Sequence, residues 1–353
     1  MDYKIIKDEK AFIDEKIDWN NIMNRMENST PFQTWEWNYI WWKHNENPES
    51  LFIIKAFERR QIYGYAPIVI KNNTAEFIGG KDMDYGKFVV VEKAMSIIEG
   101  FIKILLEQGF SLALQEMPAR DSQLHMVERV LENRKRYLVH RTTRAAYVNM
   151  FQYHSFDDYF KLLSKSMRNK TIKVGLKKNL ELRKETVTDE LMLELREIYS
   201  NRQEARVGES TIDWAIDVIK DMNEAGLLNI YIARNKEENE AVGFLVSMTS
   251  KNKQYIWLVA FKQKYKNCFP GQLLFYQVIK DGFEDKNDSV DFMRGDYDFK
   301  MRWECELDSN YTVYCFRHFS DFWIHKLFFL WKPRVKKIVY SHSWLERMYK
   351  RYA

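Results

Sequence analysis

Residues 227–250, LLNIYIARNKEENEAVGFLVSMTS, give the clearest indication of the fold. Two apolar runs, residues 228–233 and 242–248, are rich in β-branched and aromatic side chains and flank a polar turn. This pattern predicts a β-hairpin. Hydrophobic periodicity then predicts a third strand, a helix and a further strand, at residues 255–261, 271–283 and 290–293. The stretch therefore opens a unit of strand, hairpin, strand, helix and strand.

The first half of the chain repeats this order. Its predicted strands lie at residues 51–57, 63–70, 76–78 and 88–91. A helix follows at residues 92–108, and a closing strand at residues 110–115. The first strands of the two copies and the strands after their helices are offset by nearly the same distance, which indicates an internal repeat. We expect further helices at residues 11–26 and 34–44, the second with a tryptophan stripe that packs in the core. Two long helices, residues 156–181 and 189–206, are expected between the copies.

The predicted architecture is therefore α/β (α+β), with two repeated units and a helical tail. Each unit is expected to hold a mixed, mostly antiparallel sheet flanked by helices. Two domains agree with a length of 353 residues at about 150 residues per domain. We place the N-terminal unit at residues 1–145, the C-terminal unit at 146–320 and an aromatic and basic tail at 321–353.

Composition excludes several classes. A hydrophobic content of 46% with 30% charged residues excludes an intrinsically disordered chain. Three cysteines without CxxC spacing exclude a disulfide framework, and seven histidines without an HxxxH pair give no zinc ligand set, so no metal is expected. The N-terminus lacks a signal-peptide apolar region and no apolar run reaches about 18 residues. We expect a soluble, cytoplasmic protein.

Charge is unevenly placed. The net charge is +5, and the last 22 residues carry four Lys and three Arg against Glu346, which gives +6 for the tail and −1 for the rest. A uniformly basic nucleic-acid-binding surface is therefore disfavoured. The aromatic segment at residues 322–331, followed by this basic stretch, is a pairing seen in interfacial anchors, so weak membrane-surface contact is one reading. Packing of the aromatic segment on the second unit is the favoured one.

Local signatures of common enzymes are absent. There is no GxGxxG, no GxxxxGK[ST] and no GxSxG motif. Four other segments occur in order along the chain: Pro31-Phe32-Gln33-Thr34; Gly79-Gly80 followed by Asp84-Tyr85; Ser164-Lys165-Ser166-Met167-Arg168; and Pro270-Gly271 followed by Asp291-Phe292 and Gly295-Asp296-Tyr297-Asp298-Phe299-Lys300.

This ordered set resembles the CelD-like acetyltransferases, a family of the GNAT acyltransferase superfamily close to the Fem-type peptidyltransferases. The resemblance covers about residues 30–320. It implies a tandem of two GNAT-like folds, with acetyl-CoA or another acyl-CoA as donor and a small-molecule amine or amino sugar as acceptor. Family members usually end the last motif in Tyr-Lys, whereas this chain has Phe299-Lys300, so a phenol hydroxyl is missing there.

The donor site is expected at Pro270, Gly271 and Gln272. Free backbone N–H groups in the first turn of a helix, at the positive end of its dipole, can hold a pyrophosphate. Ordinary helix initiation by Pro and Gly is the structural alternative. Only the second copy enters its helix through Pro-Gly, so coenzyme A is expected there and not in the first copy.

The catalytic residues are expected to be Asp296 and Lys300, with Asp291 and Gly295 binding substrate beside them. A carboxylate at the end of an apolar strand can take a proton from an attacking ammonium, and a lysine can pair with a substrate anion. A solvated turn with surface ion pairs is the structural alternative. Both charges are expected on an exposed loop, so that replacing them hardly changes stability.

Three more residues complete the predicted site. Asp84 and Tyr85 would bind substrate from the first unit, facing the second across the interface. Arg168 would bind an anionic substrate group bidentately, although a solvated basic helix face is the slightly favoured reading.

Three functions remain open from the sequence. The favoured one is an acyl-CoA-dependent N-acyltransferase that acts on an amino sugar or a cell-envelope or exopolysaccharide precursor. The second is a Fem-type aminoacyltransferase that uses aminoacyl-tRNA, the one reading with a nucleic-acid partner. The third is a non-catalytic module of a polysaccharide-synthesis complex. Fold alone does not decide among them.

Overall fold

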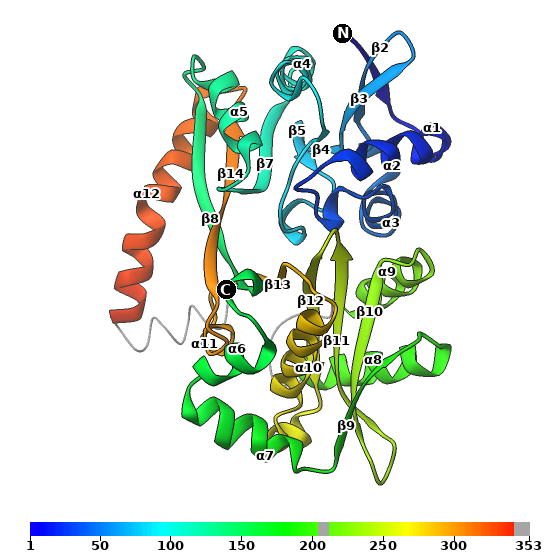
Figure 1. Cartoon of the computed structure of the whole chain (residues 1–353). Coiled ribbons are helices and arrows are strands. Elements are labelled where there is room, and N and C mark those ends of the chain that lie inside the picture. The colour runs from blue at the N-terminus through cyan, green and yellow to red at the C-terminus, as the bar shows by residue number, and fades with distance from the viewer. Residues whose placement is uncertain (204–211, 342–353) are drawn as a thin grey trace.

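The computed structural model describes residues 1–203 and 212–341 of the chain. Two sheets form its frame (Figure 1). The smaller sheet has the strand order β1 (Asp2–Ile6), β2 (Ile53–Glu58), β3 (Gln61–Ala66) and β6 (Val89–Val90). The larger sheet has the order β4 (Ile68–Lys71), β5 (Thr74–Phe77), β7 (Ser111–Pro118), β14 (Glu306–Cys315), β8 (Tyr137–Asn149), β13 (Ser289–Arg294), β12 (Lys253–Phe261), β11 (Ala241–Ser250), β10 (Leu228–Asn235) and β9 (Leu180–Glu185).

Helices cover these sheets. They are α1 (Glu9–Asp14), α2 (Lys16–Arg25), α3 (Trp35–Asn45), α4 (Ala94–Glu107), α5 (Ser122–Leu131), α6 (Phe156–Leu162), α7 (Lys173–Leu176), α8 (Asp189–Gln203), α9 (Ile212–Glu224), α10 (Pro270–Glu284), α11 (Asp298–Met301) and α12 (Phe319–Ser341). The mixed α/β architecture with flanking helices is the predicted fold class.

The internal repeat is present. In each half, an antiparallel run of strands is followed by a helix and then by a strand that pairs in parallel with an earlier strand; in the first half the short β6 lies between that earlier strand and the helix. The parallel pairs are β5 with β7 around α4, and β12 with β13 around α10. Apolar residues recur at helical spacing along α4 and α10, so each helix buries one face on its sheet.

Two long strands join the halves. β8 and β14 pair antiparallel from Tyr147 with Glu306 to Tyr137 with Cys315, and they run along the molecule between its upper and lower parts (Figure 1). β14 also pairs with β7 of the first half, and β8 pairs with β13 of the second. The sheet is therefore continuous across residue 145, and the division into residues 1–145 and 146–320 stays a proposal.

Several predicted elements need correction. The long helix expected at residues 156–181 is wrong: the chain forms α6, a π-helix at Ser166–Ile172, the short α7 and then strand β9. The helix expected at residues 11–26 is broken at Glu15, whose carboxylate accepts hydrogen bonds from Lys55 and Tyr65. Pro67 separates β3 from β4, so the run at residues 63–70 is divided between the two sheets.

The tryptophan stripe packs in the core as expected. Trp35, Trp41 and Trp42 of α3 are each less than a tenth exposed and belong to the cluster that fills the first half. Trp37 stacks on Trp41 and meets Trp257 of β12 edge to face, so aromatic packing also ties the two halves together.

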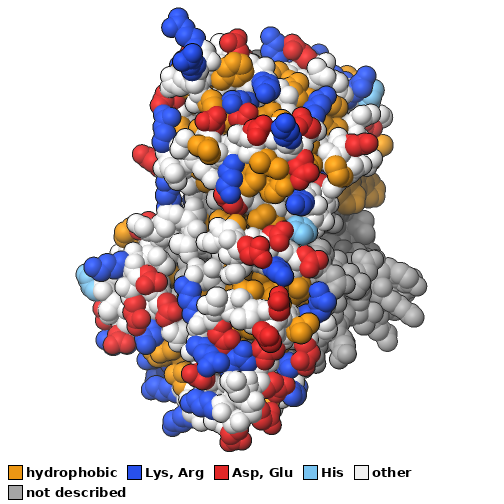
Figure 2. Space-filling view, turned by 90° about the vertical axis from the view of Figure 1, so that its right-hand side faces the viewer, with side chains coloured by type: hydrophobic (Ala, Val, Ile, Leu, Met, Phe, Trp, Pro, Cys, Tyr) orange, Lys and Arg blue, Asp and Glu red, His pale blue; other side chains and the backbone are white. Residues whose placement is uncertain are grey.

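The tail begins with an exposed apolar helix. Large side chains along α12 are about half exposed or more: Phe319, Trp323, Ile324, Leu327, Phe328, Leu330 and Trp331. The side chains of the basic stretch after Trp331 lie outside the described residues, so membrane-surface contact stays a prediction. No helix in the described part of the chain is long and apolar enough to cross a membrane. Figure 2 shows acidic and basic side chains intermixed over the face it presents.

Candidate functional site

A cleft opens where two parallel strands separate. β12 and β13 pair only from Lys253 with Ser289 to Tyr255 with Asp291. Beyond that point residues 256–259 and 292–294 form the two walls of a space of about 1150 Å³ that opens to solvent. Residues of the first half, Asp82 and Asp84, close one end.

Each wall carries a β-bulge. In β12 the register against β11 shifts so that Trp257 has no partner in the ladder between Ile256 and Leu258. In β13 the register against β8 shifts between Asp291 and Arg294, and Met293 has a left-handed φ of 59°. A bulge removes backbone groups from the ladder and redirects side chains, and bulges are common beside active sites.

A second groove continues the cleft toward α10. The two share Val259, Phe275 and Phe299, and the groove ends at Gly271 and Gln272 in the first turn of α10. Pro270 occupies the N1 position of this 15-residue helix, and no side chain caps it. Lys266 and Arg302 also line the groove. Two of the three predicted donor residues, Gly271 and Gln272, thus lie at the end of a continuous channel, with cationic side chains beside them, whereas Pro270 is buried and does not line it.

The corresponding place in the first half is filled. β5 and β7 pair in parallel over three residues, and the following loop lies against β7. Gly86 donates its N–H to the carbonyl of Glu116, and a Cβ at Gly86 would lie 2.1 Å from the carbonyl oxygen of Gln115. Only a glycine allows this approach. The loop therefore occupies the space that is open in the second half.

Asp84 is the buried carboxylate of the cleft. Its side chain is 3% exposed; Oδ2 accepts the backbone N–H of Arg294 at 3.3 Å, and Oδ1 lies 3.2 Å from Arg294 Nε. Oδ1 has no hydrogen-bond partner of good geometry among the described residues. Burial raises the pKa of Asp84 to about 6, although Arg294 opposes the shift. The group can therefore exchange a proton near neutral pH.

Tyr85 joins the halves next to Asp84. Its hydroxyl donates to the carboxylate of Asp291 and lies 2.8 Å from both oxygens, and both residues are buried. Oδ1 of Asp291 also accepts the backbone N–H of Met293 at 2.7 Å, which fixes the bulge of β13. Burial raises the pKa of Asp291 and that of Tyr85. The expectation that Asp84 and Tyr85 face the second unit is confirmed.

Lys300 is buried rather than exposed. Its side chain is 6% exposed, and Nζ donates to the carbonyls of Phe292, Met293 and Arg294 at 2.6, 3.2 and 2.6 Å. Burial lowers the pKa of Lys300 to about 8. The expectation of an exposed loop charge is wrong here, because the lysine of α11 folds back onto the bulged end of β13. Lys300 lines the cleft and holds its wall in shape.

Asp296 and Gly295 lie at the rim. Asp296 is 52% exposed and its Oδ2 lies 3.4 Å from Arg144 Nη1; it does not line the cleft. Gly295 has a φ of 99°, and a Cβ there would lie 2.3 Å from the ring of Tyr297. Gly295 therefore makes the turn that returns the chain toward Lys300.

Arg168 lies apart from these residues. It belongs to the π-helix after α6, its Nε donates to the carbonyl of Leu163 at 2.9 Å, and it lines neither the cleft nor the groove. The bulge at Trp257 was missed because a register shift has no sequence signal. Arg294 directly follows the strand predicted at residues 290–293, among other charged residues, but only the structure shows that it pairs with Asp84. Among the described residues no group of His, Cys, Asp and Glu could hold a metal ion.

Comparison with known proteins agrees with this architecture. Residues 164–301 match the family model of an acetyltransferase (GNAT) domain. No curated protein matches the chain. The chain is similar to the crystal structure of FemX, with 12% identity, coverage of 94% of this chain and 99% of that chain, and a TM-score of 0.63.

Two other solved structures have similar coverage. L-PGS from Bacillus licheniformis has 13% identity, coverage of 88% of this chain and 94% of that chain, and a TM-score of 0.58. A tandem GNAT protein from the clavulanic acid biosynthesis pathway has 10% identity, coverage of 89% and 97%, and a TM-score of 0.50. These likenesses show the fold alone. The chain has the tandem GNAT fold, and residues 164–301 match a GNAT acetyltransferase domain; the narrower CelD-like resemblance stays a prediction.

Proposed function

We propose that the chain is an acyl-CoA-dependent N-acyltransferase. The observation that carries the proposal is the continuous channel between β12 and β13. It joins the free first turn of α10, which suits a pyrophosphate, to a cleft with a buried carboxylate of raised pKa. A thioester donor is long enough to need such a channel, and a small polar molecule is not.

The donor would lie along β12 with its phosphates at Gly271 and Gln272. Lys266 and Arg302 supply positive charge there, and the apolar middle of the groove suits the pantetheine arm. Gln272 is held by the indole N–H of Trp303, which donates to its Oε1 at 3.0 Å. The amine acceptor, which we take to be an amino sugar or an envelope precursor, would enter from the side of Asp84.

The reaction follows from this placement. The neutral amine attacks the thioester carbonyl, the tetrahedral oxyanion collapses with cleavage of the C–S bond, and the leaving coenzyme A thiolate takes up the second proton that the amine nitrogen loses. Backbone N–H groups freed at the Trp257 bulge are the candidate donors to the oxyanion. Asp84 accepts the proton that the acceptor ammonium loses, directly or through water. Lys300 acts as a positioning residue through the carbonyls of β13, and a proton-accepting role for Asp296 stays a prediction.

Direct binding tests the donor. We expect desulfo-coenzyme A to bind saturably in titration calorimetry, and acetyl-CoA with amino-sugar acceptors to release free thiol. The parallel arm uses bulk aminoacyl-tRNA. Binding of tRNA without binding of coenzyme A would support the Fem-type aminoacyltransferase instead. Binding of neither donor would support the non-catalytic module.

A further inference from the structure

A second cavity lies behind the active centre, between the two halves of the molecule. It comprises about 550 Å³ of space that is open to solvent. Its lining comes from four separate segments: the turn before α3, the loop after β5, the turn after β7 and the start of β12. This cavity is separate from the channel, because none of its ten lining residues also lines the cleft or the groove.

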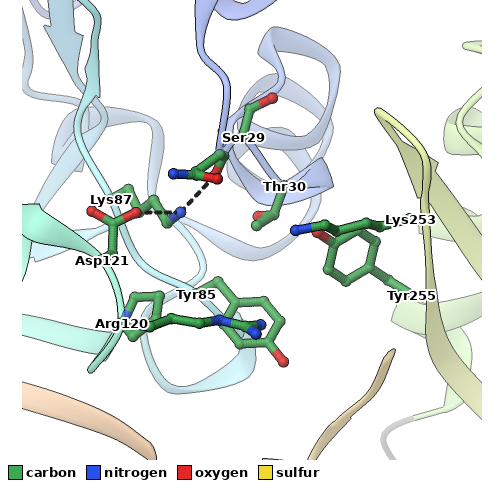
Figure 3. A pocket seen from close by; sticks show the side chains of 10 residues that line it. Ser29, Thr30, Tyr85, Lys87, Arg120, Asp121, Lys253 and Tyr255 are labelled. Carbon is green, nitrogen blue, oxygen red and sulfur yellow. Dashed lines mark hydrogen bonds and ion pairs between the residues drawn. The ribbon is translucent and has the colours of Figure 1, made fainter. Parts of the chain in front are cut away.

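Cations dominate this cavity. Its lining has Lys87, Arg120 and Lys253 against the single carboxylate of Asp121. Figure 3 shows Lys87 and Arg120 on one side and Lys253 reaching in from the other. The surplus of positive charge indicates an anionic ligand.

Two of the cations already have partners. Lys87 Nζ lies 2.6 Å from Asp121 Oδ2 and donates to the carbonyl of Asn28 at 2.6 Å, so it is held in place. Arg120 Nε lies 2.9 Å from Asp308 Oδ2, and its guanidinium lies over the ring of Tyr147. That contact uses one edge of the guanidinium, which has five N–H donors.

Lys253 has no such partner. No carboxylate in the described part of the chain forms an ion pair with it. Its ammonium reaches toward Thr30 from the opposite side of the cavity (Figure 3). A cation that is partly buried in a cavity without a counter-charge is suited to bind one from a ligand.

Neutral polar groups complete the lining. Ser29 and Thr30 are buried, and the hydroxyls of Ser29 and Tyr255 donate to no side chain or carbonyl of the described residues. Hydroxyl and amide groups of this kind bind the hydroxyls of a ligand. They can donate to an oxyanion and also accept from the hydroxyls of a ligand, so a hydroxylated anion would use both capacities.

We propose that this rear cavity binds a small hydroxylated molecule through an oxyanion, a phosphate or a carboxylate, held between Arg120 and Lys253. Tyr85 lines the cavity with its ring and holds Asp291 with its hydroxyl, and its neighbour Asp84 lines the catalytic cleft. The ligand would therefore contact the residue that joins the two halves beside the active centre. The site is independent of the donor channel.

Calorimetry on the full chain tests the proposal with four probes: inorganic phosphate, glucose 6-phosphate, glucuronate and uncharged glucose. We expect saturable binding of at least one anionic sugar and none of glucose. Lys253→Gln should weaken this binding about tenfold or more, the scale of a lost charge-assisted contact. Lys251→Gln is the matched control, because Lys251 is exposed on the same hairpin and does not line the cavity.

The probes separate the possible oxyanions. Preference for glucose 6-phosphate supports a phosphate ligand, and preference for glucuronate supports a carboxylate. Failure of both anionic sugars to bind overturns the proposal, as does equal binding by wild type and Lys253→Gln. Desulfo-coenzyme A is titrated into the same variants, and its affinity should not change. Failure of the rear site is thereby distinguished from failure of the acyltransferase proposal.

Discussion

Asp84 is the residue whose titration should control the reaction. Its pKa of about 6 places the carboxylate form, which accepts a proton, in the majority at pH 7. We expect kcat/KM to fall as the pH drops below about 6, because the protonated acid is no longer a base. Asp84→Asn should lower kcat/KM about a hundredfold and remove this acidic limb from the pH profile.

Asp296→Asn is the comparison for that experiment. Asp296 is exposed at the rim, and we expect its variant to keep most of the activity. A hundredfold loss in Asp296→Asn with near-normal turnover in Asp84→Asn would return the proton-accepting role to Asp296. Circular dichroism of both variants checks that the fold is intact.

The same carboxyl links stability to pH. In the folded chain its pKa is raised from 3.8 to about 6, so the native state binds this proton more tightly than the unfolded chain. Its contribution to stability is therefore fully present below pH 3.8 and is lost as the pH rises through 6. We expect Asp84→Asn to flatten the dependence of the unfolding free energy on pH between 4 and 6, measured by urea unfolding.

Tyr85 should matter for stability because its hydroxyl partners a buried carboxylate. Tyr85→Phe leaves the two oxygens of Asp291 with only the N–H of Met293, and we expect a loss of about 1–3 kcal/mol in urea unfolding. Tyr39→Phe is the matched control, because its hydroxyl bonds the exposed Glu9. Equal losses in the two variants would contradict a special role for the Tyr85 contact.

At the scale of elements, hydrophobic periodicity predicted the helices and hairpins whose formation depends on residues close in sequence. The hairpin of β10 and β11 and the helices α4 and α10 carry clear periodicity, and they form where it places them. β9 (LELRKE) has the composition of a helix and becomes a strand because it pairs with the edge of β10. β8 and β14 were not predicted, since the two pair with each other across more than 150 residues of the chain and their polar residues hide the alternation.

The candidate site likewise has residues that local sequence rules predict and residues that only long-range contacts bring together. Pro270 and Gly271 mark the start of α10 from sequence alone, because Pro at N1 is a local rule. The contacts of Asp84 with Arg294 and of Tyr85 with Asp291 each span more than 200 residues. Burial of Lys300 depends on the bulge at Met293, which no local pattern signals.

The mouth of the groove gives a prediction for charge at the element scale. Lys266 of the segment before α10 lines the groove, whereas Lys264 of the same segment is ion-paired with Glu240 outside it. We expect Lys266→Gln to weaken desulfo-coenzyme A binding about three- to tenfold, with the loss shrinking at high salt as the charge is screened. Lys264→Gln should bind normally. Equal effects of both variants would argue against phosphates at this mouth.

At the scale of the whole molecule, the two halves share one sheet. β14, which comes near the end of the second half in the chain, lies between β7 of the first half and β8, and the first half cannot complete its sheet without it. Between residues 1–203 and 212–341, the part that the structure describes, the shared sheet therefore leaves no simple boundary between the halves, unlike domains joined by a linker. We infer that the two GNAT-like halves unfold as one cooperative unit.

Two buried valines test that cooperativity. Val313 of β14 packs in the core of the first half, and Val246 of β11 packs in the second; both are fully buried. Each Val→Ala variant should lose about 1–3 kcal/mol, because each leaves a cavity. In one cooperative unit, either variant lowers the protection of β7 and of β10 by the same amount, as followed by native-state hydrogen exchange near the unfolding transition. If Val313→Ala weakened only β7 and Val246→Ala only β10, the halves would fold separately, and the shared sheet would be a contact between two independent domains.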